Sequence, residues 1–313
     1  MKKLLIVSML ISSLVLSACS KAPTQNNSQE PSGEEFTIGI LPAESAIPII
    51  LAEEKGFFEE EGIDVSIKSF SSPNDRNVAV QAKELDATIA DVMTEASFKQ
   101  NGINMVITSD ISEDFKILSS PDSGITDMKG LGGKKISLVK NFILEYIMDE
   151  FASENGFTYE EVEIPSFSGR SEALMANQID GVVFTEPQAS MLVKQGAHLL
   201  GSSKEAGIKG GTLQFTEDMV NNRPADIKAF YRAYNKAVDY MNESDASEYS
   251  SILADYQFPE AIGTYLSTVT EEYKHAGIIE KDQFDSIINW SVEKGQLKNS
   301  YEYDELTNFS FIK

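Results

Sequence analysis

The feature that most constrains the fold is the alternation of strand and helix patterns in residues 36–91. Three short apolar segments in this stretch predict buried strands, at 36–41, 63–69 and 87–91. Helical patterns lie between them, and Pro73 stands in the first turn of the second predicted helix, where a missing backbone N–H costs little. The order strand–helix–strand–helix–strand is the unit of an open parallel sheet.

A second run of the same kind occupies residues 135–200. Its predicted helices begin near Asn141, Ser168 and Glu186, and the chain becomes mostly helical from Pro224 onward. We therefore expect an α/β fold of two lobes, each an open, mostly parallel sheet flanked by helices, with a ligand cleft between the lobes. The predicted boundaries are 36–112 plus 210–313 for lobe 1 and 113–209 for lobe 2, joined by two extended crossings.

The first 35 residues are interpreted as signals for export and anchoring. A basic start precedes a predominantly apolar run of 13 residues at 4–16, which is too short for a mature membrane-spanning helix, since such a helix needs about 20 residues. Residues 1–18 are thus a predicted signal peptide. The sequence LSAC at 16–19 resembles a bacterial lipobox, which implies cleavage before Cys19 and lipid attachment to its sulfur.

An ordinary signal peptide with an incidental cysteine is the alternative. It is disfavoured because Cys19 is the only cysteine in the chain and has no disulfide partner. Residues 19–35 are polar and poor in aliphatic side chains, so they are a predicted flexible tether. The lipid on Cys19 would hold the folded part at the extracytoplasmic face of the cell membrane.

The acidic composition limits the classes of partner. The formal net charge is −23, and removal of Lys2 and Lys3 with the signal peptide leaves −25. Nucleic acid binding needs a basic face, so it is not expected. Acidity also disfavours adsorption to anionic lipid. The sequence shows no metal-ligand spacing and no cofactor motif, and we expect neither a metal nor a cofactor.

Ligand-binding residues are expected where strands end and helices begin, because open α/β sheets bind ligands at the carboxyl ends of their strands. Backbone N–H groups at helix starts also favour anions. The polar and charged residues at these places are Glu44, Ser45, Ser72, Asn74, Arg76, Asp91 and Thr94 in lobe 1, and Asn141, Glu145, Ser168, Arg170, Thr185 and Glu186 in lobe 2. Three of them, Ser45, Ser72 and Ser168, are also predicted helix N-caps.

Arg76 and Arg170 are the most specific pair among these candidates. Each stands near the start of the second helix of its lobe, and across a cleft the two would hold one carboxylate, sulfonate or phosphate by bidentate hydrogen bonds. The structural alternative is an ion pair within each lobe, for example between Arg76 and Asp75.

The acidic and aromatic candidates also have two possible roles, one in ligand binding and one in the structure. Asp91, Glu145 and Glu186 either bind an amine or ring N–H of the ligand or serve as helix caps and partners of the arginines. The aromatic residues near the same helix starts are either walls of a pocket for a planar ligand or core residues; they are Phe142, Tyr146, Phe167 and Phe184.

Three segments resemble solute-binding proteins of the nitrate, sulfonate, taurine and thiamine-precursor class. They are IILAEEKGFF at 49–58 with EGIDV at 61–65, KGLGGKKI at 129–136, and QIDGVVFTEP at 178–187, where Asn177 replaces a common glycine. The resemblance covers residues 36–205 well and the C-terminal helices only in outline. It implies a two-lobe periplasmic-binding-protein fold of type II.

The resemblance also implies a function. A protein of this class captures a small solute and delivers it to the permease and ATPase subunits of an ABC importer, and we expect such a protein to be a monomer. Two alternatives stay open: a sensory binding protein without transport, and an enzyme on the same fold, related to pyrimidine-precursor or menaquinone biosynthesis. The enzyme is disfavoured because the pyrimidine-precursor enzymes carry a cysteine cluster, and this chain has only Cys19.

Overall fold

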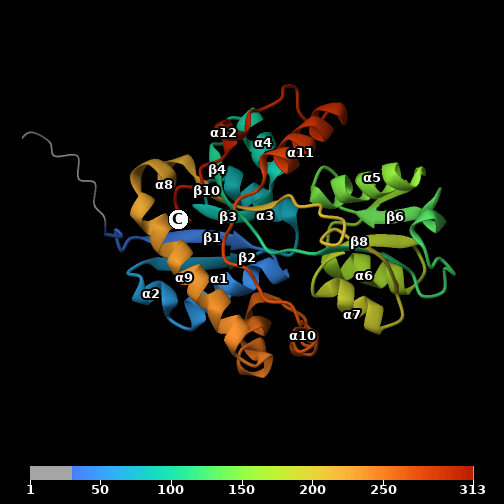
Figure 1. The fold of residues 1–313 in the computed structure, drawn as a ribbon, viewed down its shortest axis with the longest axis horizontal. Helices are drawn as coiled ribbons and strands as arrows, with labels where there is room; N and C mark the ends of the chain where they lie inside the picture. Colours follow the sequence, from blue (N-terminus) through green and yellow to red (C-terminus); the bar gives the residue numbers. More distant parts are fainter. Residues whose placement is uncertain (1–29, 313) are drawn as a thin grey trace, which may run out of the picture.

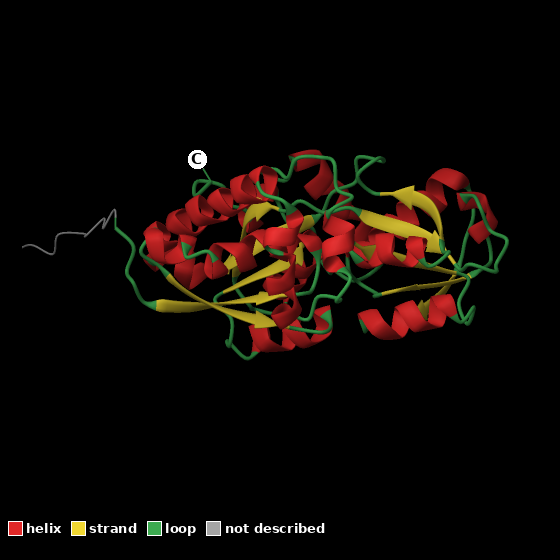
Figure 2. Cartoon of the chain, turned by 90° about the horizontal axis from the view of Figure 1, so that it is seen from below, coloured by secondary structure: helices red, strands yellow, loops and turns green. Residues whose placement is uncertain are grey.

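The structure, a computed structural model, describes residues 30–312. It contains two α/β lobes side by side, each built on a five-stranded sheet (Figure 1). The chain passes from the first lobe to the second after residue 110 and returns before residue 211, so two crossings connect the lobes. The side view shows the same elongated, two-part shape (Figure 2). The predicted fold class is confirmed.

The first sheet has the strand order β2-β1-β3-β10-β4. Strand β1 runs parallel to β2 and β3, whereas β10 is antiparallel to both β3 and β4. Strand β3 is buried along its whole length, as a central strand covered on both faces should be. The bounds are β1 Glu35–Ile40, β2 Asp64–Ser69, β3 Ala87–Asp91, β4 Met105–Asp110 and β10 Gly211–Thr216.

Helices cover both faces of this sheet (Figure 1). On one face the core joins Phe36 and Ile38 of β1 to α1 (Ile47–Glu54), α2 (Phe57–Glu60) and the long helix α9 (Pro224–Glu243). On the other face lie α3 (Pro73–Gln81) and α4 (Val92–Gln100). Gly39 lets α3 approach, since a Cβ at that position would come within 2.5 Å of Leu85 and 3.4 Å of the Arg76 side chain.

The rest of the C-terminal part adds short helices to the first lobe. Helix α11 packs against α4 and extends toward the second lobe (Figure 1). The bounds of these helices are α8 Glu217–Asn222, η3 Ala246–Glu248, η4 Ser250–Tyr256, α10 Ile262–Leu266, α11 Lys281–Glu293 and α12 Tyr303–Leu306. The short helix η1, Glu44–Ala46, precedes α1 near the start of the lobe.

The second sheet has the order β7-β6-β8-β5-β9, with β6 parallel to β7 and β8 and with β5 antiparallel to β8 and β9. Helices α6 and α7 share one small core with β8, and α5 packs on the opposite face. The bounds are β5 Phe115–Ser119, η2 Met128–Leu131, β6 Lys135–Leu138, α5 Ile143–Asn155, β7 Glu160–Glu163, α6 Phe167–Met175, β8 Gly181–Thr185, α7 Gln188–Lys194 and β9 His198–Ser202.

Three predicted helix starts are wrong in detail. Ser45 caps no helix with its side chain, because it lies inside the short helix η1. Ser166, and not Ser168, is the N-cap of α6, and its hydroxyl accepts the Gly169 N–H. Asn141 lies two residues before α5 with a φ of 65°. Ser72 is the N-cap of α3, as predicted.

The folded part of the chain begins before residue 36. The Ser32 backbone N–H and hydroxyl both donate to the Asp226 carboxylate at 2.6 Å, at the start of α9. The predicted signal peptide, the lipidation site Cys19 and most of the tether lie outside the described residues. No helix within residues 30–312 has the length and apolarity needed to cross a membrane.

Candidate functional site

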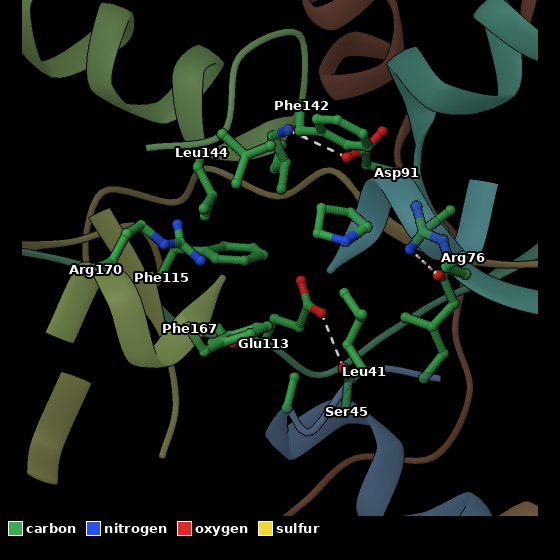
Figure 3. Close-up of a pocket in the computed structure, with 17 residues that line it drawn as sticks. Leu41, Ser45, Arg76, Asp91, Glu113, Phe115, Phe142, Leu144, Phe167 and Arg170 are labelled. Carbon is green, nitrogen blue, oxygen red and sulfur yellow. Dashed lines mark hydrogen bonds between the residues drawn. The ribbon is translucent and has the colours of Figure 1, made fainter. Parts of the chain in front are cut away.

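A cleft between the lobes is lined by the carboxyl ends of β1, β3, β6 and β8 and by the starts of α3, α5 and α6 (Figure 3). Its empty space, counted with its opening to solvent, is about 640 Å³. The lining residues are Leu41, Ala43, Ser45, Pro73, Arg76, Ile89, Ala90, Asp91, Glu113, Phe115, Val139, Phe142, Ile143, Leu144, Phe167, Arg170 and Thr185. This is the edge at which open α/β sheets bind ligands.

The two predicted arginines face the cleft from opposite lobes (Figure 3). Each is the fourth residue of its helix, and each donates a hydrogen bond from Nη1 to a carbonyl of a neighbouring strand. For Arg76 the acceptor is Ile89 of β3, and for Arg170 it is Val183 of β8, at 3.4 Å. Each lobe thus places an arginine at the cleft with the same local geometry.

Arg170 is the less satisfied of the two guanidinium groups. It is 1% exposed and lies over the rings of Phe184 and Phe167, at 4.5 and 5.3 Å from their centroids. Its Nε has no hydrogen-bond partner within the described residues. Burial lowers the pKa of Arg170 to about 9, so the group stays positively charged at neutral pH. Arg76 donates further hydrogen bonds to Asn77 Oδ1, at 3.0 and 2.8 Å.

Two carboxyl groups share the cleft with these arginines. Both oxygens of Asp91 accept backbone N–H groups, Oδ1 from Thr94 at 2.8 Å and Oδ2 from Ile143 of the other lobe at 3.2 Å. Glu113 lies on the first crossing and accepts one hydrogen bond, from the Ser45 hydroxyl at 2.9 Å. Burial raises the pKa of both carboxyl groups, that of Glu113 to about 8.

These four ionisable groups form no ion pair with any partner among residues 30–312, and the ion-pair alternative for Arg76 is therefore wrong. Buried charges are normally paired, because an unpaired one loses its hydration without compensation. The cleft therefore holds two cationic groups, Arg76 and Arg170, and two carboxyl groups, Asp91 and Glu113, that a ligand would complement.

The remaining predicted site residues lie elsewhere. Asn74, Thr94 and Asn141 line a second, more polar groove beside the cleft. Ser72 serves its helix cap, its hydroxyl accepting the Asp75 N–H at 3.2 Å, and Ser168 is exposed on α6. Of the thirteen predicted residues, the cleft brings together Ser45, Arg76, Asp91, Arg170 and Thr185.

The three other predicted acids already have protein partners. Glu44 accepts hydrogen bonds from the hydroxyls of Tyr265 and Tyr273, at 2.7 and 2.9 Å. Glu145 pairs with Lys294 at 2.7 Å, and Glu186 pairs with Lys116. These carboxylates stabilise the structure around the cleft and do not line it.

The aromatic candidates divide between the cleft and the core. Phe142 and Phe167 line the cleft together with Phe115, which was not predicted. Phe184 packs under the Arg170 guanidinium, and Tyr146 packs edge-on against Trp290. The cleft wall is therefore largely apolar between its charged groups.

The lobes are in direct contact around the cleft. The Glu44 N–H donates to the Glu186 carbonyl at 2.9 Å, and the Gln188 side chain donates to the Pro42 carbonyl at 2.7 Å. The Asp91–Ile143 hydrogen bond also joins the two lobes. Within residues 30–312, no group of three or more metal-ligating side chains is arranged to hold an ion.

Solved structures with this architecture define the fold as the two-lobe periplasmic-binding-protein fold. The alkanesulfonate-binding protein SsuA from Xanthomonas axonopodis pv. citri, bound to MOPS, superposes with a TM-score of 0.75, at 16% identity, over 89% of this chain and 99% of that one. The periplasmic nitrate-binding protein NrtA from Synechocystis PCC 6803 superposes with a TM-score of 0.73, at 14% identity, over 90% and 88%.

The chain belongs to the NMT1/THI5-like family, whose model matches residues 44–246. A Bacillus subtilis (strain 168) protein named for binding aliphatic sulfonates is 29% identical over 226 residues, which are 67% of this chain and 66% of that protein. The THI11 protein of Saccharomyces cerevisiae (strain ATCC 204508 / S288c), named a 4-amino-5-hydroxymethyl-2-methylpyrimidine phosphate synthase, is 26% identical over 227 residues, 66% of each chain. The matches thus span just under two thirds of the length of these relatives.

Proposed function

We propose that this protein is an extracytoplasmic solute-binding protein that captures a small organic anion or zwitterion between its lobes and delivers it to an ABC importer. The observation that carries the proposal is Arg170, a buried cation that faces the cleft without a carboxylate partner among the described residues. A carboxylate, sulfonate or phosphate of the ligand would supply that partner by charge-assisted hydrogen bonds.

The finer parts of the proposal concern the anchor and the partners. A lipid on Cys19 would tether the protein to the outer face of the cell membrane, and the permease and ATPase subunits would recognise the closed lobes. Mass spectrometry of the membrane fraction tests the anchor: the N-terminal peptide should carry a diacylglyceryl group on Cys19, and Cys19→Ser should release the protein. An unmodified N-terminus at Cys19 or upstream of it would contradict the lipoprotein proposal.

We propose binding without chemistry, although some relatives are named synthases. Neither histidine of the chain lines the cleft, so the lining contains no Ser–His pair. The lining hydroxyl of Ser45 donates to the Glu113 carboxyl group, which we assign to ligand binding. Recovery of a bound ligand chemically unchanged after long incubation is the expected result. A converted ligand, detected by mass spectrometry, would favour the enzyme.

Two experiments test the ligand class. A thermal-shift screen of sulfonates, carboxylates, vitamins and pyrimidine precursors identifies compounds that stabilise the protein. Calorimetry with small sulfonates and carboxylates then measures their affinities. Arg170→Ala should weaken binding of the strongest hit by at least about 30-fold, roughly 2 kcal/mol, because a buried charge-assisted contact is lost. Arg232→Ala is the matched control, since its side chain is 54% exposed and pairs with Glu61 on the surface. Equal affinity of wild type and Arg170→Ala would refute the role of Arg170.

A further inference from the structure

The position of Glu113 distinguishes it from every predicted site residue. It lies on the crossing between β4 and β5, and its carboxyl group points into the middle of the cleft, between Arg76 and Arg170 (Figure 3). The Ser45 hydroxyl holds Oε1, and the protein makes no hydrogen bond to Oε2 among the described residues. Asp91, by contrast, has both oxygens occupied by backbone N–H groups.

The fold makes room for this carboxyl group at the second crossing. Gly211 begins β10, and a Cβ there would come within 2.5 Å of Glu113 Oε2. A side chain at residue 211 would therefore displace the carboxyl group. Because Glu113 stands on one crossing and contacts the end of the other, a ligand bound to it touches the segments about which the lobes would rotate on closing.

The surroundings of Glu113 favour a positively charged nitrogen as its partner. Leu41, Phe115 and Phe167 line the cleft beside it, and an apolar environment strengthens the attraction between a carboxylate and a cation. The charged groups that act on it are Asp91 of β3, Arg76 of α3 and Glu44 of η1. Two of these three are acidic, so the nearest charges of the first lobe are net negative, and Arg170 of the second lobe is left for the anionic group of the ligand.

Building on the proposed function, we propose that Glu113 selects ligands with a positively charged nitrogen, so that the solute is a small organic zwitterion with its anionic group on Arg170 and its ammonium or protonated ring nitrogen on Glu113. The Glu113 carboxyl group, whose pKa is raised to about 8, is neutral in the empty cleft at pH 7. Contact with the cation ionises it, and binding releases a proton. Affinity for such ligands then rises with pH up to about 8.

Matched pairs of ligands that differ only in the cation test this inference. One pair is 2-aminoethanesulfonate and 2-hydroxyethanesulfonate, and the other is 3-aminopropanoate and 3-hydroxypropanoate. We expect the wild type to bind the amine of at least one pair 10- to 100-fold more tightly than the alcohol. Calorimetry in two buffers of different ionisation enthalpy should show release of close to one proton at pH 7 for the amine and none for the alcohol.

Glu113→Gln keeps the shape and a hydrogen-bonding group, and it should abolish both the preference and the proton release. Glu59→Gln, on the exposed surface of α2, is the control and should retain both. Equal binding of amine and alcohol by the wild type would overturn the role of Glu113 and leave the proposed function standing. Failure of all four compounds to bind would overturn the assignment of small organic anions to this cleft, and the role of Glu113 with it.

Discussion

Lys294, at the C-terminal end of α11, links the first lobe to α5 of the second lobe. Its Nζ lies 2.7 Å from Glu145 and 2.9 Å from Asp149. Asp149 also accepts hydrogen bonds from Trp290 Nε1 at 2.9 Å and from the Tyr159 hydroxyl at 2.8 Å. The Tyr159 contact lies within the second lobe, whereas the Lys294 and Trp290 contacts join the two lobes and are expected to break when the lobes separate.

Replacing Lys294 by methionine keeps the length of the side chain and removes its charge. Glu145 is 1% exposed and would be left with one hydrogen bond, from the Asn141 N–H at 2.7 Å. Breaking a buried ion pair costs about 3–5 kcal/mol, but Lys294 is 37% exposed and partly screened by water. We therefore expect the closed form to lose about 2 kcal/mol relative to the open form, a shift of about 30-fold in their ratio.

Trp290 is the only tryptophan of the chain and lies at this contact, so its emission reports opening. Lys294→Met should shift the emission of the ligand-free protein to the red, increase the radius of gyration in X-ray scattering and weaken ligand binding. Lys281→Met on the same helix is the control, since the Lys281–Asp285 pair is exposed, screened by water and far less important to stability than a buried pair. Identical scattering and ligand affinity of the two variants would refute the reasoning.

Two further predictions concern stability. Glu95 is fully buried, neither carboxyl oxygen has a hydrogen-bond partner within the described residues, and burial raises its pKa to about 8. The folded state thus holds a proton that the unfolded state releases above pH 4.5, so Glu95 lowers the stability by about 3 kcal/mol between pH 5 and pH 8. Urea denaturation should show that the free energy of unfolding of Glu95→Met declines less between pH 5 and pH 8 than that of the wild type. The same pH dependence in both proteins would contradict this role of Glu95. Ser166→Ala should cost about 1 kcal/mol as a lost N-cap and Ser168→Ala close to none, and the reverse order would contradict the assigned start of α6.

The fold was predictable because its signals are local. Apolar strands separated by capped helices specify the order of elements, and Arg76 and Arg170 were found because a helix start at the end of a strand is a recognisable position. Glu113 was missed because it lies on a crossing without helical or strand periodicity. Its role depends on Ser45 and Gly211, which are remote in sequence and adjacent only in the folded chain.

The predicted residues that lie outside the cleft were misassigned for a similar reason: the contacts that decide their roles are not visible in the local sequence. Glu145 stands at a helix start, where a ligand contact is reasonable, but its partner Lys294 lies about 150 residues further along the chain. Glu44 contacts Tyr265 and Tyr273 over still larger separations of 221 and 229 residues. Ser166 and Ser168 are both acceptable caps in the sequence, and only the backbone geometry of residues 166–169 decides between them.

Closure of the lobes over a ligand is tested most directly by a distance measured between them. Spin labels are attached to cysteines that replace Glu59 of α2 and Glu172 of α6, both exposed, in a chain that also carries Cys19→Ser. Double electron–electron resonance spectroscopy then measures the distance between the labels. Saturating 2-aminoethanesulfonate should move the distribution to a shorter and narrower distance, and Arg170→Ala should prevent the change. An identical distribution with and without this compound, once calorimetry has shown that it binds, would contradict capture between the lobes.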